Sequence, residues 1–148
     1  MRLHGDREPR QKPIGTTGGA FCASGAANEV WSYGEEVLEI CSKFLHLREE
    51  MREYTRGLMK MAHETGDPIM RPCFYDFPED QMSWVKEDQY MYGPKYLCAP
   101  ILNAGQTERK VYLPNGASWV GLEGEKLEGG NEVTVDCPLD TMPVFTRL

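Results

Sequence analysis

The segment ETGDPIMRP, residues 64–72, separates two parts of the chain that differ in their pattern of apolar residues. Before it, from Glu35 onward, apolar side chains recur at spacings of three and four, the period of one face of an α-helix. After Pro68, apolar residues occur in short runs separated by proline and glycine, which is typical of strands joined by turns. The sequence therefore predicts a helical part followed by a β-rich part, with a boundary near Gly66.

The helical pattern covers residues 35–65, and its apolar positions form one stripe. The members of this stripe are Val37, Leu38, Cys41, Phe44, Leu45, Met51, Tyr54, Leu58, Met61 and Ala62. Gly66, followed by aspartate and proline, is typical of a helix end. A helix of about 30 residues is longer than most globular helices, so we expect a break near Glu53 or Gly57.

The β-rich part contains six candidate strands. They are Ile69–Phe77, Tyr96–Ile101, Lys110–Leu113, Trp119–Val120, Glu132–Cys137 and Val144–Thr146. Short strands at such intervals favour an antiparallel β-sandwich or meander. Pro78 and the acidic pair after it are expected to begin a loop or a short helix.

Residues 1–34 have a different composition, rich in glycine, proline, serine and threonine. This composition favours a loop over regular structure. A structureless segment of about 30 residues is uncommon inside a compact domain, where such segments are usually functional or disordered.

Overall charge and cysteine content narrow the functional classes. The 148 residues carry 16 basic and 23 acidic side chains, a net charge of −7, which argues against non-specific binding to nucleic acid or to anionic membranes. No apolar run approaches the roughly 18 residues of a membrane span. The five cysteines are odd in number and lack CxxC spacing, so we expect neither a disulfide framework nor a zinc site, and the cytoplasm is weakly favoured. Four of them, Cys41, Cys73, Cys98 and Cys137, lie in apolar patterns and are expected to be small buried hydrophobes.

Two groups of polar or aromatic residues have a functional and a structural interpretation. Asp76, Glu79 and Asp80 are carboxylates suited to acid/base chemistry, but we expect them to be surface residues of a loop and a helix start. The aromatic residues Trp31, Tyr33, Trp84, Tyr90 and Tyr92 can stack on sugars, but in a β-domain they are expected to be core residues.

Several motifs in a fixed order resemble glycoside hydrolase family 31, the α-glucosidase and α-xylosidase family, over essentially the whole chain. The run from Met70 to Pro100 is the most specific part of this resemblance. The motifs are RLHG at 2–5, NEVWSYG at 28–34, the helix segment 47–54, ETGDPIMRP at 64–72, DFPED at 76–80, DQYMYG at 88–93, API at 99–101 and VYLP at 111–114.

The resemblance implies an α+β fragment of a larger enzyme. Residues 1–66 would be the last β/α unit of a (β/α)8 TIM barrel, and residues 67–148 the proximal C-terminal β-sandwich domain. Within the first part, Arg2–Gly5 would end the eighth barrel strand, and residues 6–34 would be the loop after it. Barrel active sites are built from such loops, which would explain the length of this one.

The resemblance also implies the chemistry and the site residues. Family members are retaining enzymes with one aspartate as nucleophile and another as general acid/base, and both would precede Met1, so this chain has no catalytic residue of its own. His4 matches the family histidine that hydrogen-bonds the sugar in the −1 subsite, and Arg2 would orient it. The implied partners are an α-linked glucoside or xyloside and an upstream catalytic barrel portion, with no cofactor or metal and with assembly beyond a monomer in many members.

Two functional interpretations remain open. The chain is either the C-terminal portion of such an α-glycosidase, inactive alone, or a stand-alone carbohydrate-binding or scaffolding β-module. The determinants of glucose or xylose preference would lie mainly in barrel loops outside this chain. We also expect the apolar stripe of residues 37–62 to promote self-association where no neighbouring barrel elements cover it.

Overall fold

A computed structural model describes residues 30–148 of the chain. The chain divides into two compact units, Met1–Thr55 and Arg56–Leu148, which are described separately below. The predicted strand at Arg2–Gly5, and residues 6–29 of the predicted loop, lie outside the described residues. The barrel unit therefore stays a prediction.

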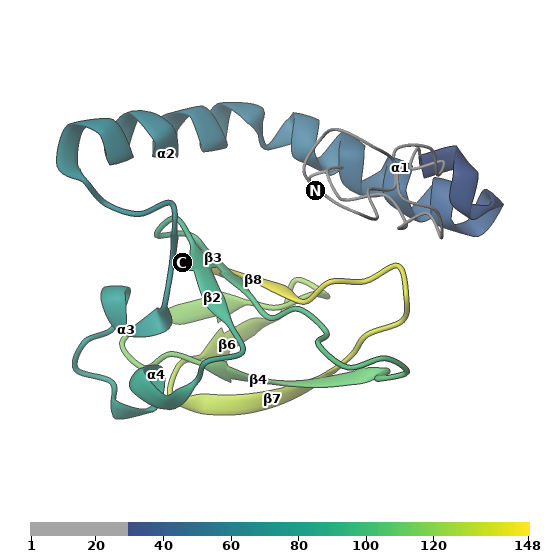
Figure 1. The fold of residues 1–148 in the computed structure, drawn as a ribbon. Helices are drawn as coiled ribbons and strands as arrows, with labels where there is room; N and C mark the ends of the chain where they lie inside the picture. Colours follow the sequence, from purple (N-terminus) through teal and green to yellow (C-terminus); the bar gives the residue numbers. More distant parts are fainter. Residues whose placement is uncertain (1–29) are drawn as a thin grey trace, which may run out of the picture. The chain divides into compact units, whose positions relative to one another are not determined.

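The helical part contains a short 3₁₀ helix and two α-helices (Figure 1). η1 (Val30–Tyr33) precedes α1 (Glu35–Glu50), and α2 (Arg52–Thr65) follows α1 after the single residue Met51. The predicted break thus occurs at Met51, whose ψ is 1°. Met51 lies two residues before Glu53. Gly57 lies within α2, so the alternative break at that glycine is wrong.

The end of α2 confirms the predicted stop signal. The amide of Gly66 donates to the carbonyl of Ala62 over 3.1 Å, and Gly66 has φ +82°. This left-handed conformation is strained for residues with a Cβ atom, which is why glycine commonly follows the last turn of a helix. The chain then turns into the β-rich unit through Asp67 and Pro68.

The β-rich unit contains two antiparallel sheets (Figure 1). The larger sheet has the order β1-β2-β3-β8-β5-β6. Its strands are β1 (Met70–Arg71), β2 (Tyr90–Tyr92), β3 (Tyr96–Cys98), β8 (Val144–Arg147), β5 (Ser118–Val120) and β6 (Lys126–Glu128). The smaller sheet pairs β4 (Glu108–Leu113) with β7 (Asn131–Asp136), with Val111 opposite Val133. The predicted antiparallel character is confirmed.

One predicted strand is largely wrong. Of Ile69–Phe77, only Met70–Arg71 is a strand, and Cys73–Asp76 forms the one-turn helix α3. Pro72 separates them because it lacks the N–H that a strand ladder needs and precedes the helix at φ −64°. Of the two alternatives expected after Pro78, a loop or a short helix, the structure shows the short helix α4 (Gln81–Val85).

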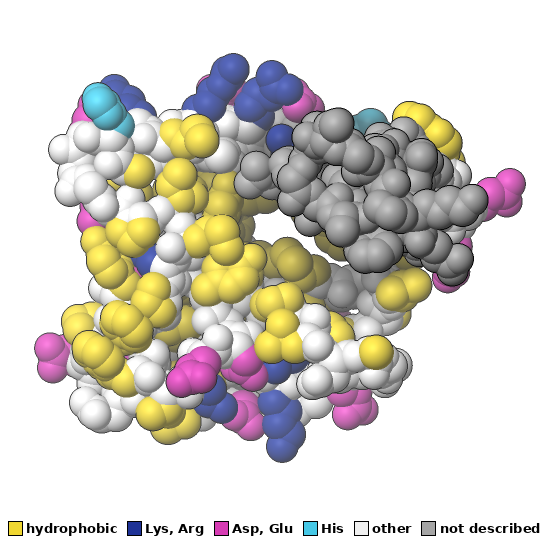
Figure 2. Space-filling view, in the orientation of Figure 1, with side chains coloured by type: hydrophobic (Ala, Val, Ile, Leu, Met, Phe, Trp, Pro, Cys, Tyr) yellow, Lys and Arg dark blue, Asp and Glu magenta, His cyan; other side chains and the backbone are white. Residues whose placement is uncertain are grey.

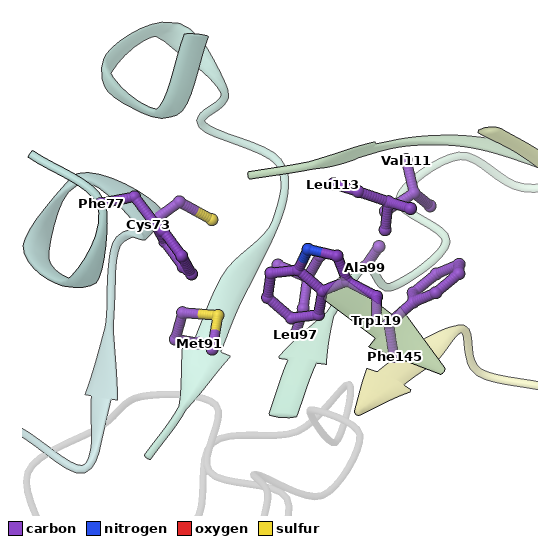
Figure 3. Close-up of a cluster of buried hydrophobic side chains, with 9 residues drawn as sticks. All are labelled: Cys73, Phe77, Met91, Leu97, Ala99, Val111, Leu113, Trp119 and Phe145. Atoms are coloured by element: carbon purple, nitrogen blue, oxygen red, sulfur yellow. The ribbon is translucent and has the colours of Figure 1, made fainter. Parts of the chain in front are cut away.

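The core of the β-rich unit lies between the two sheets and α3 (Figure 3). Strands of the larger sheet, β4 and α3 contribute most of the buried side chains, and the residues directly after β3 and α3 contribute the others. The buried cluster consists of Cys73, Phe77, Met91, Leu97, Ala99, Val111, Leu113, Trp119 and Phe145. The indole N–H of Trp119 donates to the carbonyl of Pro114 over 3.2 Å, so this buried polar group is satisfied. This unit therefore has a hydrophobic core of its own.

The overall class is α+β with antiparallel sheets, in agreement with that part of the prediction. Among residues 30–148, no helix combines the length and the apolar character that crossing a membrane requires.

Candidate functional site

The predicted substrate-binding residues Arg2 and His4 lie outside the described residues. Their roles stay predictions. Residues 30–148 bring together several other polar groups.

Asp76 forms an ion pair with Arg71, in which the Nε atom of Arg71 lies 2.7 Å from Oδ2 of Asp76. The two side chains are only 5% and 12% exposed, so the expectation that Asp76 is a surface residue is wrong. Burial raises the pKa of Asp76 above its usual range, and the attraction of Arg71 opposes this rise without cancelling it. The arginine also lies over the ring of Tyr75, 5.1 Å from its centroid. Asp76 therefore joins β1 to α3 as a structural group.

Asp80 starts α4, as predicted, and also binds two distant parts of the chain. Its carboxylate accepts hydrogen bonds from the amides of Met82 (3.1 Å) and Asn115 (2.9 Å), and from the hydroxyls of Ser83 and Tyr112 (3.0 Å each). Burial raises the pKa of Asp80, but these hydrogen bonds outweigh burial and hold it below the usual range. The ionised carboxylate of Asp80 therefore connects α4, β4 and the turn after β4. Because its pKa is lowered, it is not suited to act as a general acid at neutral pH.

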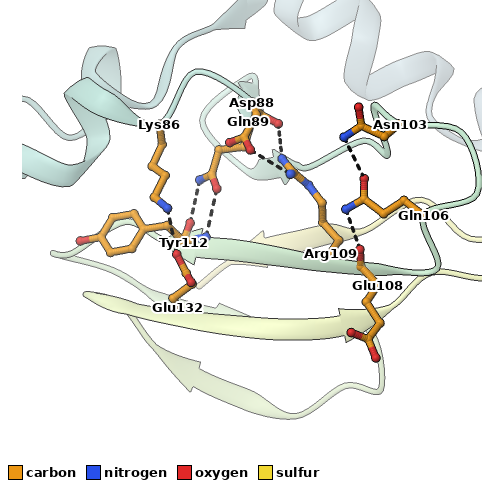
Figure 4. A network of polar contacts seen from close by, with 9 residues as sticks. All are labelled: Lys86, Asp88, Gln89, Asn103, Gln106, Glu108, Arg109, Tyr112 and Glu132. Atoms are coloured by element: carbon orange, nitrogen blue, oxygen red, sulfur yellow. Dashed lines mark hydrogen bonds and ion pairs between the residues drawn. The ribbon is translucent and has the colours of Figure 1, made fainter.

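A second polar network borders β4 (Figure 4). The side-chain amide of Gln89 pairs with the backbone of Tyr112 in both directions, donating to its carbonyl over 2.7 Å and accepting from its N–H over 3.0 Å. This amide thus occupies the edge of β4 that β7 leaves free. Next to it, Arg109 donates to the carboxylate of Asp88 over 2.8 Å, and this bond is the main reason why the pKa of Asp88 is lowered.

The sequence analysis did not identify this network. A detectable signal is the polar pair Asp88-Gln89 directly before an aromatic strand. A buried glutamine needs partners for both ends of its amide, which points to backbone pairing.

The expectation that the aromatic residues are core residues is wrong for three of the five. Trp31, Tyr33 and Trp84 are 67%, 56% and 53% exposed, whereas Tyr90 and Tyr92 are half-buried. The ring of Trp84 stacks on that of Phe74 with a centroid separation of 4.4 Å and an interplanar angle of 10°. Its indole N–H donates to the carbonyl of Pro78 over 2.9 Å.

The cysteines behave largely as predicted. Cys73, Cys98 and Cys137 are buried, Cys41 is half-buried, and all four are free thiols. Burial raises the pKa of the Cys73 thiol, and it raises that of Cys98 to about 11. Thiols with raised pKa values are poor nucleophiles at neutral pH, so neither is a candidate catalytic residue.

The concave regions of the β-rich unit include two open hollows. One, of about 470 Å³, is lined by Asn115, Ser118, Lys126 and Glu128 among others. The other, of about 440 Å³, is lined by Glu123, Glu125, Asp136 and Thr141 among others. In the first hollow the hydroxyl of Ser118 donates to the carboxylate of Glu128 over 3.1 Å, but this carboxylate is 71% exposed, so the pair lacks the enclosed environment of a catalytic site.

The described residues thus define an antiparallel β-domain whose polar groups are engaged in structural contacts. The sequence model for "Glycosyl hydrolase family 31 C-terminal domain" matches residues 66–148. The chain belongs to glycosyl hydrolase family 31, whose members are glycoside hydrolases.

Curated relatives and solved structures agree with this assignment. The chain is 37% identical to "Alpha-glucosidase 2" of Bacillus thermoamyloliquefaciens, covering 85% of this chain and 16% of that protein. It is 38% identical to an alpha-xylosidase of Saccharolobus solfataricus, covering 80% and 16%. A GH31 alpha-xylosidase from a soil metagenome, solved with xylose, superposes with a TM-score of 0.82 at 48% identity, covering 96% of this chain and 21% of that one. The chain therefore spans about a fifth or less of the length of these relatives.

Proposed function

We propose that this chain is the C-terminal portion of a retaining α-glycosidase that hydrolyses α-glucosides or α-xylosides. The observation that carries this proposal is the family match over residues 66–148, together with the small share of each relative that the chain covers. In this proposal, residues 1–66 supply the last β/α unit of the catalytic barrel, and residues 67–148 are the proximal β-domain beside it.

The reactive groups of the proposed enzyme precede Met1. A retaining mechanism needs two carboxyl groups about 5–5.5 Å apart, one as nucleophile and one as general acid/base. Asp76 and Asp80 do not qualify, because Arg71 neutralises the first and four donors hold the second. The fragment alone is therefore expected to be inactive.

His4 is proposed to hydrogen-bond the sugar in the −1 subsite, with Arg2 orienting it. Such a bond accelerates the reaction only as far as it strengthens while the ring distorts toward an oxocarbenium ion. Losing one hydrogen bond to an uncharged hydroxyl costs about 0.5–1.5 kcal/mol, which is about a 2- to 12-fold loss in kcat/KM.

Two measurements test this function. Genomic sequence upstream of residue 1 is expected to encode, in the same frame, an aspartate segment of the WxDxNE type, and a stop codon or promoter there would argue against the proposal. The isolated chain is expected not to hydrolyse p-nitrophenyl α-glucoside or α-xyloside. Clear hydrolysis by this chain alone would refute the proposed position of the catalytic acids.

The second candidate is a stand-alone carbohydrate-binding or scaffolding β-module. The observation that favours it is the separate hydrophobic core of the β-rich unit, which includes Trp119 and Phe145. Binding of the isolated chain on a glycan array, with no upstream catalytic sequence in frame, would support this candidate over the first.

A further inference from the structure

Exposed apolar side chains gather on the two short helices of the β-rich unit. α3 carries Phe74 and Tyr75, and α4 carries Met82, Trp84 and Val85; these five residues are called the α3–α4 patch. Figure 2 shows hydrophobic side chains on this face of the unit. All of the five except Phe74 are among the exposed large hydrophobic residues, whereas Cys73 and Phe77 of the same segment enter the core. Contiguous exposed patches of this kind mark interaction sites.

The patch is held in one conformation by contacts within the unit. Phe74 and Trp84 stack in parallel, and the indole N–H of Trp84 is fixed on the carbonyl of Pro78. The carboxylate of Asp80 caps α4 and ties it to β4 through Tyr112. A surface that is already ordered loses little conformational entropy on binding, which favours recognition.

The polar groups of the patch are already used. The hydroxyl of Tyr75 donates to Asp67, and the Trp84 N–H donates to Pro78. Sugar-binding sites combine an aromatic face with polar groups that converge on the ligand, and the patch presents none of its own. Tryptophan, tyrosine and methionine without charge are instead the composition of protein interface cores.

We propose that the α3–α4 patch is the surface on which the catalytic portion preceding this chain docks. This inference rests on the proposed function. The chain spans 16% of its curated relatives Alpha-glucosidase 2 and the Saccharolobus alpha-xylosidase, so most of the longer protein lies outside it. The patch follows directly after the connection from α2, and Tyr75 binds that connection at Asp67. Docking of a preceding portion on the patch would be intramolecular, because this chain links the two covalently.

The test compares one substitution in two contexts. The first is the isolated chain, and the second is a chimera in which this chain replaces the matched segment of the soil-metagenome alpha-xylosidase, to which it is 48% identical. Val85→Asp places a charge in the patch, and Leu139→Asp is the control because Leu139 is also exposed but lies between β7 and β8.

In the isolated chain, both variants are expected to melt as the parent does. In the chimera, Val85→Asp is expected to lower the melting temperature by about 5 °C, because the charge is buried without a partner, while Leu139→Asp has no effect. If Val85→Asp lowers the melting temperature equally in the isolated chain and in the chimera, Val85 stabilises only the β-domain itself, and the docking proposal is wrong. If the two variants have the same melting temperature in the chimera, the patch is exposed to solvent there and the proposal is wrong. Quenching of Trp84 fluorescence by isomaltotriose would instead show that the patch binds sugar.

The readout separates this inference from the proposed function. A folded wild-type chimera without α-xyloside hydrolysis would contradict the proposed function, whereas the comparison of melting temperatures tests the proposed interface.

Methionine oxidation by dilute peroxide gives an independent measurement in the product of the native gene. Met82 is expected to be protected there relative to the isolated chain, and Met142, of similar exposure, is expected to react equally in both. Equal oxidation of Met82 in both would overturn the proposal.

Discussion

At the scale of single residues, the contact between Tyr112 and Asp80 links the helix α4 to the smaller sheet. Tyr112 is buried, and its hydroxyl donates to both carboxylate oxygens of Asp80 over 3.0 Å. Burial, together with the hydrogen bond to Asp80, raises the pKa of Tyr112 from 10 to about 12. The folded state thus holds this proton more tightly than the unfolded state does.

This difference predicts how stability depends on alkaline pH. Because the folded pKa is the higher one, the contribution of Tyr112 is complete below pH 10 and is lost as the pH rises from 10 to about 12. Tyr112→Phe is expected to lower the free energy of unfolding at pH 7 by about 1–2 kcal/mol, and to flatten its decline between pH 10 and 12. Urea titrations across this pH range measure both effects.

Tyr75→Phe is the matched control for this prediction. It removes a hydroxyl bond to the carboxylate of Asp67 at an exposed site, where water replaces the lost bond. Its effect at pH 7 should therefore be smaller. A Tyr112→Phe variant whose stability falls with alkaline pH as steeply as the parent's would contradict the assignment.

At the scale of elements, the free edge of β4 is covered by a side chain instead of a strand. Gln89→Ala leaves the N–H and the carbonyl of Tyr112 without their partners in a buried position. We expect this variant to lose about 2–3 kcal/mol of unfolding free energy, because unsatisfied buried groups bear the full cost of desolvation. Chemical denaturation measures the loss.

A second glutamine bordering the same strand provides the comparison. Gln106 donates to the carbonyl of Glu108 over 2.7 Å, but it is only half-buried. Water can replace this bond, so Gln106→Ala is expected to cost less than about 1 kcal/mol. Equal losses in the two variants would show that Gln89 does not protect the edge of β4.

The types of the elements were predicted best where a periodic apolar pattern extends over many residues, or where glycine or proline marks the end of an element. The helix pattern and the glycine stop at Gly66 were visible in the sequence, and a short helix was one of the two alternatives expected after Pro78. The strands β2 and β6 were not predicted. In β6 the single apolar residue Leu127 lies between two charged residues, so the sequence there contains no apolar run. The aromatic residues of Cys73–Asp76 favour a strand in the sequence, but Pro72 prevents the strand ladder from continuing into this segment.

The candidate site was less predictable than the fold. The roles of Asp76 and Gln89 depend on Arg71 and on the backbone of Tyr112, which are brought to them by strand pairing and packing. Sequence spacing alone does not contain such contacts. The family resemblance was recognisable because many motifs occur in one order, whereas the placement of Arg2 and His4 beside a sugar stays a prediction.

At the scale of the whole molecule, the isolated chain is expected to self-associate. Along α1, the apolar side chains of Val37, Leu38, Cys41, Phe44 and Leu45 are only half-buried, and no residue of the helix is buried. Association of such surfaces is favourable in water, so sedimentation velocity should show species larger than a monomer that increase with concentration. A monodisperse monomer that unfolds cooperatively would contradict this expectation.

The central claim is that this chain completes a sugar-cleaving enzyme whose reactive acids lie elsewhere. Hydrolysis of p-nitrophenyl α-xyloside by the folded chimera with the soil-metagenome alpha-xylosidase tests it most directly. The account predicts that the chimera hydrolyses this substrate, that the 148-residue chain alone does not, and that His4→Ala lowers kcat/KM of the chimera by about 2- to 12-fold. A folded chimera without activity, or hydrolysis by the isolated chain, would contradict it.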